Sequence, residues 1–176
     1  FKDIFRRTGI SRVIWPLIEE TRMSFAVTDE ASGDLYRFVM PGPFVAESES
    51  SAILQHLATI IRSYTGYIVA SGSLLPGMPS DFYARLIAVA RPLGGQVILD
   101  THGEALKAAA TERPFLIRLN HFEAQELVGG DANRAANTLA RELVATGLTE
   151  RAIVTLGDRG AILCTARGLV EMRPPH

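Results

Sequence analysis

The hydrophobic positions of this chain change their period near residue 44. Before that point, two short runs rich in aromatic and β-branched residues, 23–27 and 35–39, show partial alternation and flank the turn-forming segment 28–34. They predict an antiparallel hairpin. Because the apolar positions do not form a uniform block, we expect two unlike faces, one of which covers a ligand or another subunit. An ordinary edge hairpin is the alternative.

From residue 44 onward, stretches with apolar residues at helical spacing alternate with short apolar runs typical of buried strands. The predicted helices are 47–64, 81–93, 104–110, 121–128 and 132–145. The predicted strands are 67–70, 96–99, 115–117 and 152–156, followed by an edge hairpin of 161–165 and 169–172. The repeated order of helix then strand predicts an α/β fold with a Rossmann-like, mostly parallel sheet and helices on both faces.

Composition narrows the class of protein. The chain has 176 residues, of which 47% are hydrophobic and 21% charged. This length and composition predict one globular domain with a sizeable core. A net charge of -1 gives no general attraction to nucleic acid or to an anionic membrane, so we expect small-molecule partners. The single cysteine, Cys164, lies in an apolar run and no apolar stretch is long enough to span a bilayer, which favours a cytoplasmic protein.

Polar residues and glycines follow four successive predicted strands. They are 71–73, Asp100, 118–120 and 155–157. In an open α/β sheet, ligands bind in the crevice beyond the carboxyl ends of the parallel strands, so these residues predict one site. Their chemistry favours a crevice that handles phosphate groups.

Asn120 and Glu123 have the spacing of a helix N-cap and its third helical residue, which is a sufficient structural explanation. The alternative follows from their position, because a carboxylate in the first turn after a strand can hold Mg²⁺ through waters beside nucleotide phosphates. Arg118 adds a cation near the same phosphates. Asp100 leaves a similar choice between the N-cap of the helix at 104–110 and an acid close to the metal.

Two loops are candidates for binding anions or ribose. The sequence Ser-Gly-Ser-Leu-Leu-Pro-Gly at 71–77 offers hydroxyls and a flexible backbone, and it is neither a Walker A loop nor a Gly-x-Gly-x-x-Gly fingerprint. The segment 155–161 has glycines at 157 and 160, which allow close backbone approach to a nucleotide; a hairpin turn is the alternative. The four histidines have no metal-ligand spacing.

These motifs occur together in one order. They are Thr-Arg at 21–22, Tyr-Arg-Phe-Val-Met-Pro-Gly at 36–42, the loop at 71–77, Asn-x-x-Glu at 120–123 and Thr-Leu-Gly-x-x-Gly-Ala at 155–161. In this combination the chain resembles the phosphofructokinase B group of ribokinase-like sugar kinases, and most of all those acting on fructose 6-phosphate, fructose 1-phosphate or tagatose 6-phosphate. The resemblance implies an ATP- and Mg²⁺-dependent kinase with a ribokinase-like fold and a small β-lid hairpin.

The resemblance also implies roles for individual residues. Arg22 and Ser73 would contact the sugar phosphate, Asn120 and Glu123 would organise Mg²⁺ and the phosphates, and Thr155, Gly157 and Gly160 would line the ATP site with Arg118 nearby. Where relatives commonly have Lys-Pro-Asn, this chain has Arg-Leu-Asn at 118–120, which keeps the charge but changes the donor geometry.

The family's Gly-Ala-Gly-Asp signature, which carries the catalytic Asp, does not occur in these residues, so no catalytic residue is assigned. We therefore expect residues 1–176 to be one incomplete kinase domain, preceded by a missing segment, with a β-lid at 21–43 and an α/β core at 44–176. We also expect a homodimer through the lid, because a projecting two-stranded ribbon exposes its edges unless it is paired.

Two other functions stay open. A ribokinase-like kinase for an unphosphorylated sugar or nucleoside is one, although a neutral sugar gives Arg22 no anion to bind. A non-catalytic domain that binds nucleotide or mediates dimerisation is the other.

Overall fold

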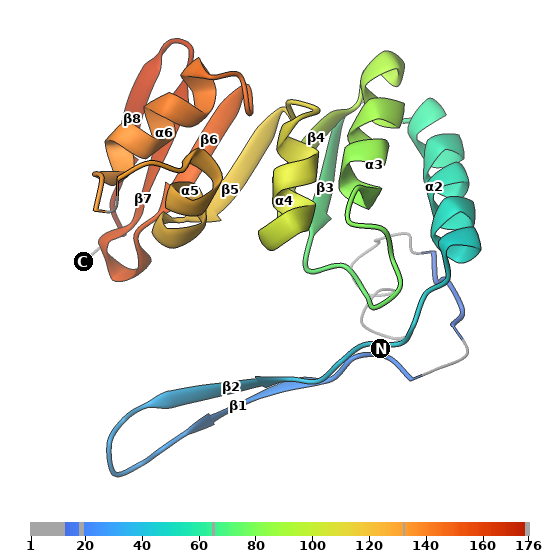
Figure 1. Ribbon diagram of the computed structural model, residues 1–176, viewed down its shortest axis with the longest axis horizontal. Helices are drawn as coiled ribbons and strands as arrows, with labels where there is room; N and C mark the ends of the chain where they lie inside the picture. The colour runs from blue at the N-terminus through green and yellow to red at the C-terminus, as the bar shows by residue number, and fades with distance from the viewer. Residues whose placement is uncertain (1–12, 18–19, 65, 132, 175–176) are drawn as a thin grey trace.

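The computed structural model describes residues 13–17, 20–64, 66–131 and 133–174, and these form two unlike parts (Figure 1). A hairpin of β1 (Ser24–Thr28) and β2 (Leu35–Val39) projects from an α/β body. The strands pair antiparallel with Phe25 opposite Phe38, as the alternating pattern predicted. The first residues of the sequence resemble the last turns of a helix closed by Gly9, and this expected helix lies outside the described residues.

The body alternates helices and strands. Its helices are α2 (Glu47–Arg62), α3 (Phe82–Ala90), α4 (Gly103–Ala110), α5 (His121–Val128) and α6 (Ala136–Ala145). Its strands are β3 (Tyr67–Ser71), β4 (Gln96–Asp100), β5 (Leu116–Asn120), β6 (Arg151–Thr155), β7 (Ala161–Thr165) and β8 (Gly168–Met172). Short 3₁₀ turns occupy Arg91–Leu93 and Gly157–Arg159. No helix in the described part of the chain is long and apolar enough to cross a membrane.

The sheet has six strands in the order β3-β4-β5-β6-β7-β8, so every strand lies beside its neighbour in sequence. The four strands from β3 to β6 are parallel, and β7 and β8 continue the sheet antiparallel to one edge. This confirms the mostly parallel α/β sheet and the edge hairpin. The carboxyl ends of β3 to β6 therefore meet at one end of the body.

The described helices lie on one face of the sheet (Figure 1). Beneath them the strands bury a continuous row of apolar side chains, among them Leu99, Ile117 and Leu119 at 0% exposure. On the opposite face, Tyr67 and Val69 at the β3 edge are 58% and 67% exposed. The α/β class is confirmed, but the second helical layer is absent from the described residues. Strands that follow one another in a single direction, joined by right-handed crossovers, place all their helices on the same face.

Several element boundaries differ from the prediction. The strand expected at 115–117 extends to Asn120, because pairing with β6 continues until Asn120 lies opposite Thr155. The helix expected at 132–145 begins only at Ala136, after Asn133 adopts a left-handed φ of 69°. The helix expected to reach Leu93 ends at Ala90, and a 3₁₀ turn containing Pro92 follows.

Candidate functional site

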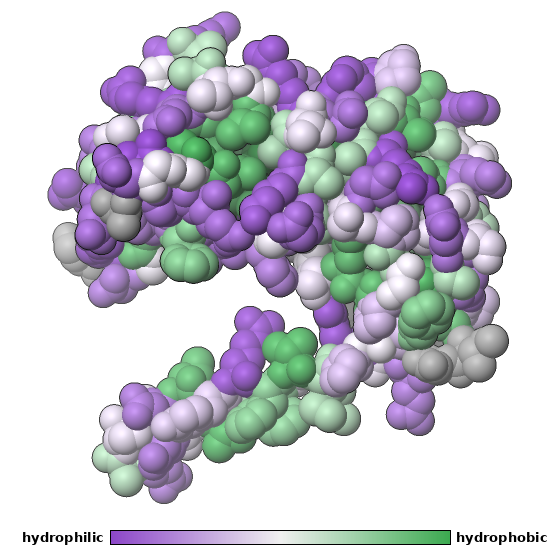
Figure 2. All heavy atoms as spheres, viewed as in Figure 1, coloured by the Kyte–Doolittle hydropathy of each residue, from purple (hydrophilic) through white to green (hydrophobic). Residues whose placement is uncertain are grey.

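A crevice lies at the carboxyl ends of β3 and β4, and the hairpin forms its other wall. Residues 118–120 and 155–157, which the sequence placed in the same site, are not among the residues that line it. A pocket of about 530 Å³ is lined by Arg22, Ser24 and Arg37 near the hairpin and by Ser73, Asp100 and Glu123 from the body. Figure 2 shows the hollow between the projecting hairpin and the body. Segments more than 80 residues apart along the chain, such as Arg37 and Glu123, thus meet across one space.

Arg22 and Ser73, both predicted to bind the sugar phosphate, are in direct contact. The Nη1 of Arg22 donates to the Ser73 Oγ at 2.5 Å across a sequence separation of 51 residues. A guanidinium beside a hydroxyl supplies several N–H donors and a rotatable O–H donor to one anion. The loop at 71–77 and the segment before the hairpin therefore contribute to the same wall of the pocket.

Arg37 was not singled out from the sequence, yet it lines the same pocket. The β1–β2 register places Arg37 opposite Ala26 and two residues from Val39, so Arg37, Val39 and Ser24 share the hairpin face that lines the crevice. Within the described residues neither Arg22 nor Arg37 forms an ion pair with an acid. The alternation of 35–39 was the signal that could have identified Arg37.

Asp100 and Arg118 end adjacent strands and form an ion pair. The Nη1 of Arg118 lies 3.2 Å and 3.3 Å from the two carboxylate oxygens of Asp100, with both side chains partly exposed. The interpretation of Asp100 as the N-cap of the next helix is wrong, because β4 continues through Asp100 opposite Ser71 and the N-cap of α4 is His102. Asp100 instead faces the pocket.

Asn120 and Glu123 form the predicted capping box. The Glu123 N–H donates to the Asn120 Oδ1 and the Asn120 N–H donates to the Glu123 Oε2, both at 2.8 Å. The other carboxylate oxygen, Oε1, has no hydrogen-bond partner in the described part of the chain, and Glu123 lines the pocket. The capping interpretation is therefore confirmed, and the cap leaves one oxygen of Glu123 free to face a ligand. The described residues contain no cluster of three or more His, Cys, Asp or Glu side chains able to hold a metal alone.

Thr155, Gly157 and Gly160 lie at the end of β6, beyond the strand that carries Asn120. The Thr155 Oγ1 donates to the Leu119 carbonyl at 3.1 Å, and residues 157–159 form the 3₁₀ turn into β7. This confirms that the segment is a turn between antiparallel strands. Gly160 has a φ of 98°, and a Cβ there would lie 2.0 Å from the Met172 carbonyl oxygen, so only glycine fits.

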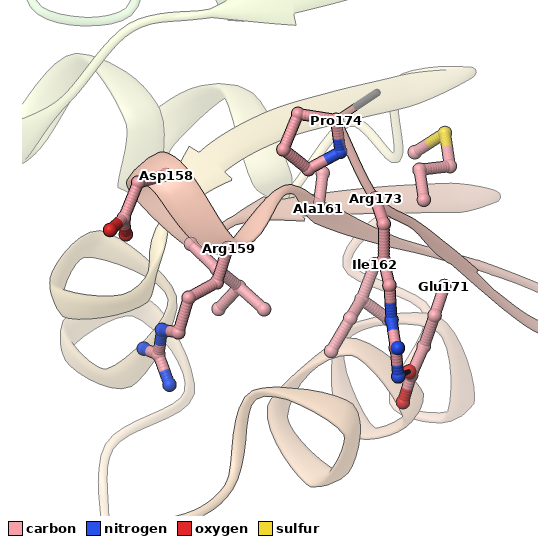
Figure 3. Close-up of a pocket in the computed structure, with 9 residues that line it drawn as sticks. Asp158, Arg159, Ala161, Ile162, Glu171, Arg173 and Pro174 are labelled. Carbon is pink, nitrogen blue, oxygen red and sulfur yellow. Dashed lines mark ion pairs between the residues drawn. The ribbon is translucent and has the colours of Figure 1, made fainter. Parts of the chain in front are cut away.

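A second pocket, of about 450 Å³, lies beside this turn (Figure 3). Asp158 and Arg159 on the turn and Ile162 on β7 form part of its lining. Glu171 and Arg173 lie side by side at the end of β8 and form an exposed ion pair at 3.7 Å. None of the residues lining this pocket also lines the pocket under the hairpin. The structure therefore places Gly157 and Gly160 apart from Arg22 and Ser73, at the far end of the same row of strand ends.

Comparisons with known proteins show the family of this chain. Residues 6–176 match the model of the pfkB family carbohydrate kinases. The chain is 35% identical over 159 residues to an ATP-dependent 6-phosphofructokinase isozyme 2 of Mycobacterium tuberculosis, covering 89% of this chain and 46% of that protein. It is 29% identical to a 1-phosphofructokinase of Xanthomonas campestris, covering 100% of this chain and 57% of that protein.

The fold is also similar to that of a solved relative. The crystal structure of phosphofructokinase-2 from Escherichia coli in complex with fructose-6-phosphate matches with a TM-score of 0.74 at 32% identity, over 86% of this chain and 50% of that chain. The chain thus spans about half the length of the curated relatives it matches. The match confirms the ribokinase-like fold expected from the sequence.

Proposed function

Because this chain belongs to the pfkB family of carbohydrate kinases, we propose that the full polypeptide transfers the γ-phosphate of ATP to a hydroxyl of a phosphorylated ketohexose. The observation that carries this proposal is the pair of arginines, Arg22 and Arg37, that line the pocket under the hairpin without an acid partner in the described residues. Two uncompensated guanidinium groups favour a substrate that already bears a phosphate. Relatives named 6-phosphofructokinase and 1-phosphofructokinase support the same substrate class.

In this proposal the sugar phosphate binds between the hairpin and the loop after β3. Arg22 and Ser73 hold its phosphate together, because their contact already brings guanidinium N–H groups and a hydroxyl to one point. Arg37 adds a second positive charge from the hairpin side. A phosphate held by both walls of the crevice orients the sugar relative to the strand ends, and orientation is a large part of catalysis by phosphoryl-transfer enzymes.

In this proposal ATP binds at the carboxyl end of β6, away from the sugar phosphate at the end of β3. Thr155, Gly157 and Gly160 would line the nucleotide, since the turn at 157–159 exposes backbone there. Arg118 and Asn120, at the end of β5, lie between the two regions and would bind the phosphates. The Arg118 guanidinium has N–H donors beyond the Nη1 that contacts Asp100, so it can pair with Asp100 and with a phosphate oxygen.

The side chains of Asp100 and Asn120, at the ends of β4 and β5, and of Glu123, in the first turn of α5, fit Mg²⁺ as a ligand. Glu123 keeps its Oε1 outside the cap, Asp100 lies in the same pocket, and Asn120 is adjacent. One or two carboxylates with waters and substrate phosphates are the usual Mg²⁺ ligands, so Glu123, Asp100 and Asn120 would hold the ion. When bound, the ion neutralises phosphate charge and polarises the transferring group. The residues assigned here bind and orient substrates, and none is assigned as the catalytic base.

We extend the proposal to a homodimer formed through the hairpin. Phe25 and Phe38 stack at a centroid distance of 5.1 Å on the face away from Arg37, and each is 48% exposed. An exposed aromatic pair on a two-stranded ribbon is typical of a surface that another chain covers. The buried free thiol of Cys164 is in keeping with a cytoplasmic location.

A coupled kinase assay on the full polypeptide tests the substrate class. Fructose 6-phosphate, fructose 1-phosphate and tagatose 6-phosphate are compared with fructose and ribose. We expect turnover of at least one sugar phosphate, and an increase of about 10- to 150-fold in its KM for Arg22→Gln, the range given by losing one charge-assisted contact. Arg141→Gln, an exposed arginine on α6, is the matched control. Turnover confined to the unphosphorylated sugars would refute the proposal.

A further inference from the structure

The carbonyl oxygen of Gly72 accepts two hydroxyl hydrogen bonds. The Tyr83 Oη, from α3, and the Thr101 Oγ1, from the loop after β4, each donate to it at 2.9 Å. Tyr83 is 9% exposed and Thr101 4% exposed. A carbonyl oxygen has two lone pairs, so these two donors saturate it. Two elements that are distant in sequence therefore converge on one backbone atom of the loop after β3.

The same residue is fixed on its other side. The Gly72 N–H donates to the Asp100 carbonyl at 2.9 Å, and Gly72 has a φ of 113° that side chains rarely adopt. A Cβ at Gly72 would meet no atom within 4 Å, so the backbone conformation rather than crowding requires glycine. Both peptide groups of Gly72 are thus held by hydrogen bonds to the body.

The orientation of this carbonyl determines where the next N–H points. In a planar trans peptide the N–H lies opposite the C=O, and no peptide bond in the described part of the chain is cis. The Ser73 N–H therefore points away from the Tyr83 and Thr101 hydroxyls. It has no hydrogen-bond partner among the described residues, while Gly72 and Ser73 line the pocket beside Arg22. A free backbone N–H next to an arginine and a hydroxyl is a donor for an anion.

We propose that Tyr83 and Thr101 are positioning residues that orient the Gly72–Ser73 peptide so that the Ser73 N–H, with the Ser73 hydroxyl and Arg22, binds the substrate phosphate. This inference rests on the proposed function for the identity of the substrate. Thr101 also lines the pocket, but its hydroxyl donates to the Gly72 carbonyl, as the Tyr83 hydroxyl does, so both act on the substrate through this peptide. Burial raises the pKa of the Tyr83 phenol, which keeps its proton on the oxygen and the hydrogen bond in place across the neutral range.

The kinetic test removes one hydroxyl at a time in the full polypeptide. Tyr83→Phe and Thr101→Val should each raise the KM for fructose 6-phosphate about three- to tenfold, the scale of one neutral hydrogen bond, with little change in kcat or in the KM for ATP. Because either hydroxyl alone still holds the carbonyl, the double variant should raise this KM by more than the product of the single effects. Thr101→Ser keeps the donor and should behave like the wild type.

A buried threonine at the opposite end of the sheet separates positioning from stability. The Thr149 Oγ1 donates to the Pro114 carbonyl at 3.0 Å and Thr149 is 0% exposed. Thr149→Val should lower the melting temperature at least as much as Thr101→Val and leave the KM for fructose 6-phosphate unchanged. The inference is wrong if Tyr83→Phe, Thr101→Val and the double variant raise the KM for fructose 6-phosphate and the KM for ATP equally. It is also wrong if these variants leave the KM for fructose 6-phosphate at the wild-type value.

A spectroscopic measurement keeps the inference testable without turnover. The Ser73 amide resonance, assigned with a Ser73→Ala variant after ¹⁵N-serine labelling, is followed during titration with inorganic phosphate. We expect it to shift in the wild type and to shift far less in the double variant. A wild-type resonance that phosphate does not move would overturn the inference, whether or not the enzyme turns over sugar phosphates. Absence of turnover with a phosphate-sensitive Ser73 amide would instead reject only the proposed function.

Discussion

The hairpin and the α/β body differ in what holds them together. Every residue of β1 and β2 is exposed, and their ladder hydrogen bonds join only each other. In the body, by contrast, Leu119 on β5 is fully buried. The body therefore supplies nearly all of the apolar burial that stabilises the fold. The hairpin contributes side chains to the crevice without contributing a core.

This difference separates binding from stability within one site. Arg37 is carried by a ribbon whose strand residues are all exposed, whereas Gly72, beside Ser73, is held by a hydrogen bond from α3 and Glu123 by one from the end of β5. A two-stranded ribbon alone is marginally stable in water. Substitutions in the hairpin should therefore change ligand binding or association, and substitutions in the body should change folding as well.

The largest expected effect compares two leucine truncations. Leu119→Ala removes a fully buried side chain and should lower the free energy of unfolding by about 2–5 kcal/mol. Leu35→Ala removes a side chain on the hairpin that is 67% exposed. It should change the free energy of unfolding by less than about 0.5 kcal/mol. Urea denaturation of the full polypeptide measures both. Similar losses for the two variants would show that the hairpin shares in the cooperative core.

Glu123→Gln tests whether the body residue does more than cap its helix. Gln also serves at the third position of a capping box, so the free energy of unfolding should change by at most about 1 kcal/mol. If the charge of Glu123 supports Mg²⁺, activity should fall by roughly 10- to 100-fold and recover in part at high Mg²⁺. Thermal melting and a Mg²⁺ titration of the activity distinguish a capping role from a Mg²⁺-supporting role of Glu123. Unchanged kinetics would leave Glu123 as a helix cap alone.

The outer face of the hairpin is expected to hold two copies together. Phe25→Asp combined with Phe38→Asp places two charges on the stacked aromatic pair and should weaken dimerisation at least about tenfold, with a parallel rise in the KM for the sugar phosphate. Light scattering over a dilution series measures the association. Thr28→Asp, on the opposite face of the ribbon, is the control for association. A double variant that stays dimeric with an unchanged KM would exclude this face as the interface.

The smallest effect concerns the hairpin turn. The Asp29 carboxylate accepts a hydrogen bond from the Ala31 N–H at 2.8 Å, and this backbone N–H is the main reason that the pKa of Asp29 lies below its usual value of 3.8. A lowered pKa means that the contact stabilises the turn fully above pH 3.8 and is lost as the pH falls through the lower, folded value. The Ala31 amide resonance should therefore shift only below that pH, and Asp29→Ala should abolish the shift.

Local patterns in the sequence were sufficient to predict most elements. The apolar spacing of 47–64 and 121–128 identified α2 and α5, and the spacing of Asn120 and Glu123 identified a capping box that the structure confirms. These features depend on residues within about one helical turn or one strand of each other. Their physical causes, side-chain periodicity and satisfaction of the first helical N–H groups, are present in the sequence itself.

Boundaries that depend on pairing were predicted less well. The sequence left Asp100 as either a helix cap or an acid close to the metal, and 118–120 as a junction, because it does not show where a neighbouring strand ends. In the structure Asp100 pairs with Ser71 and Asn120 with Thr155, so both residues belong to strands. The one-sided placement of the helices likewise follows from strand order, which is a property of the whole sheet.

The sequence by itself determined the class of fold, the family and the candidate residues at the strand ends, since each is encoded in short-range patterns and motifs. Only the tertiary structure showed that Arg37 joins Arg22 in one pocket and that Tyr83 and Thr101 meet on the Gly72 carbonyl. The physical reason is that these residues lie 11 to 29 positions apart in the sequence, and their geometry is set by chain packing rather than by any local preference.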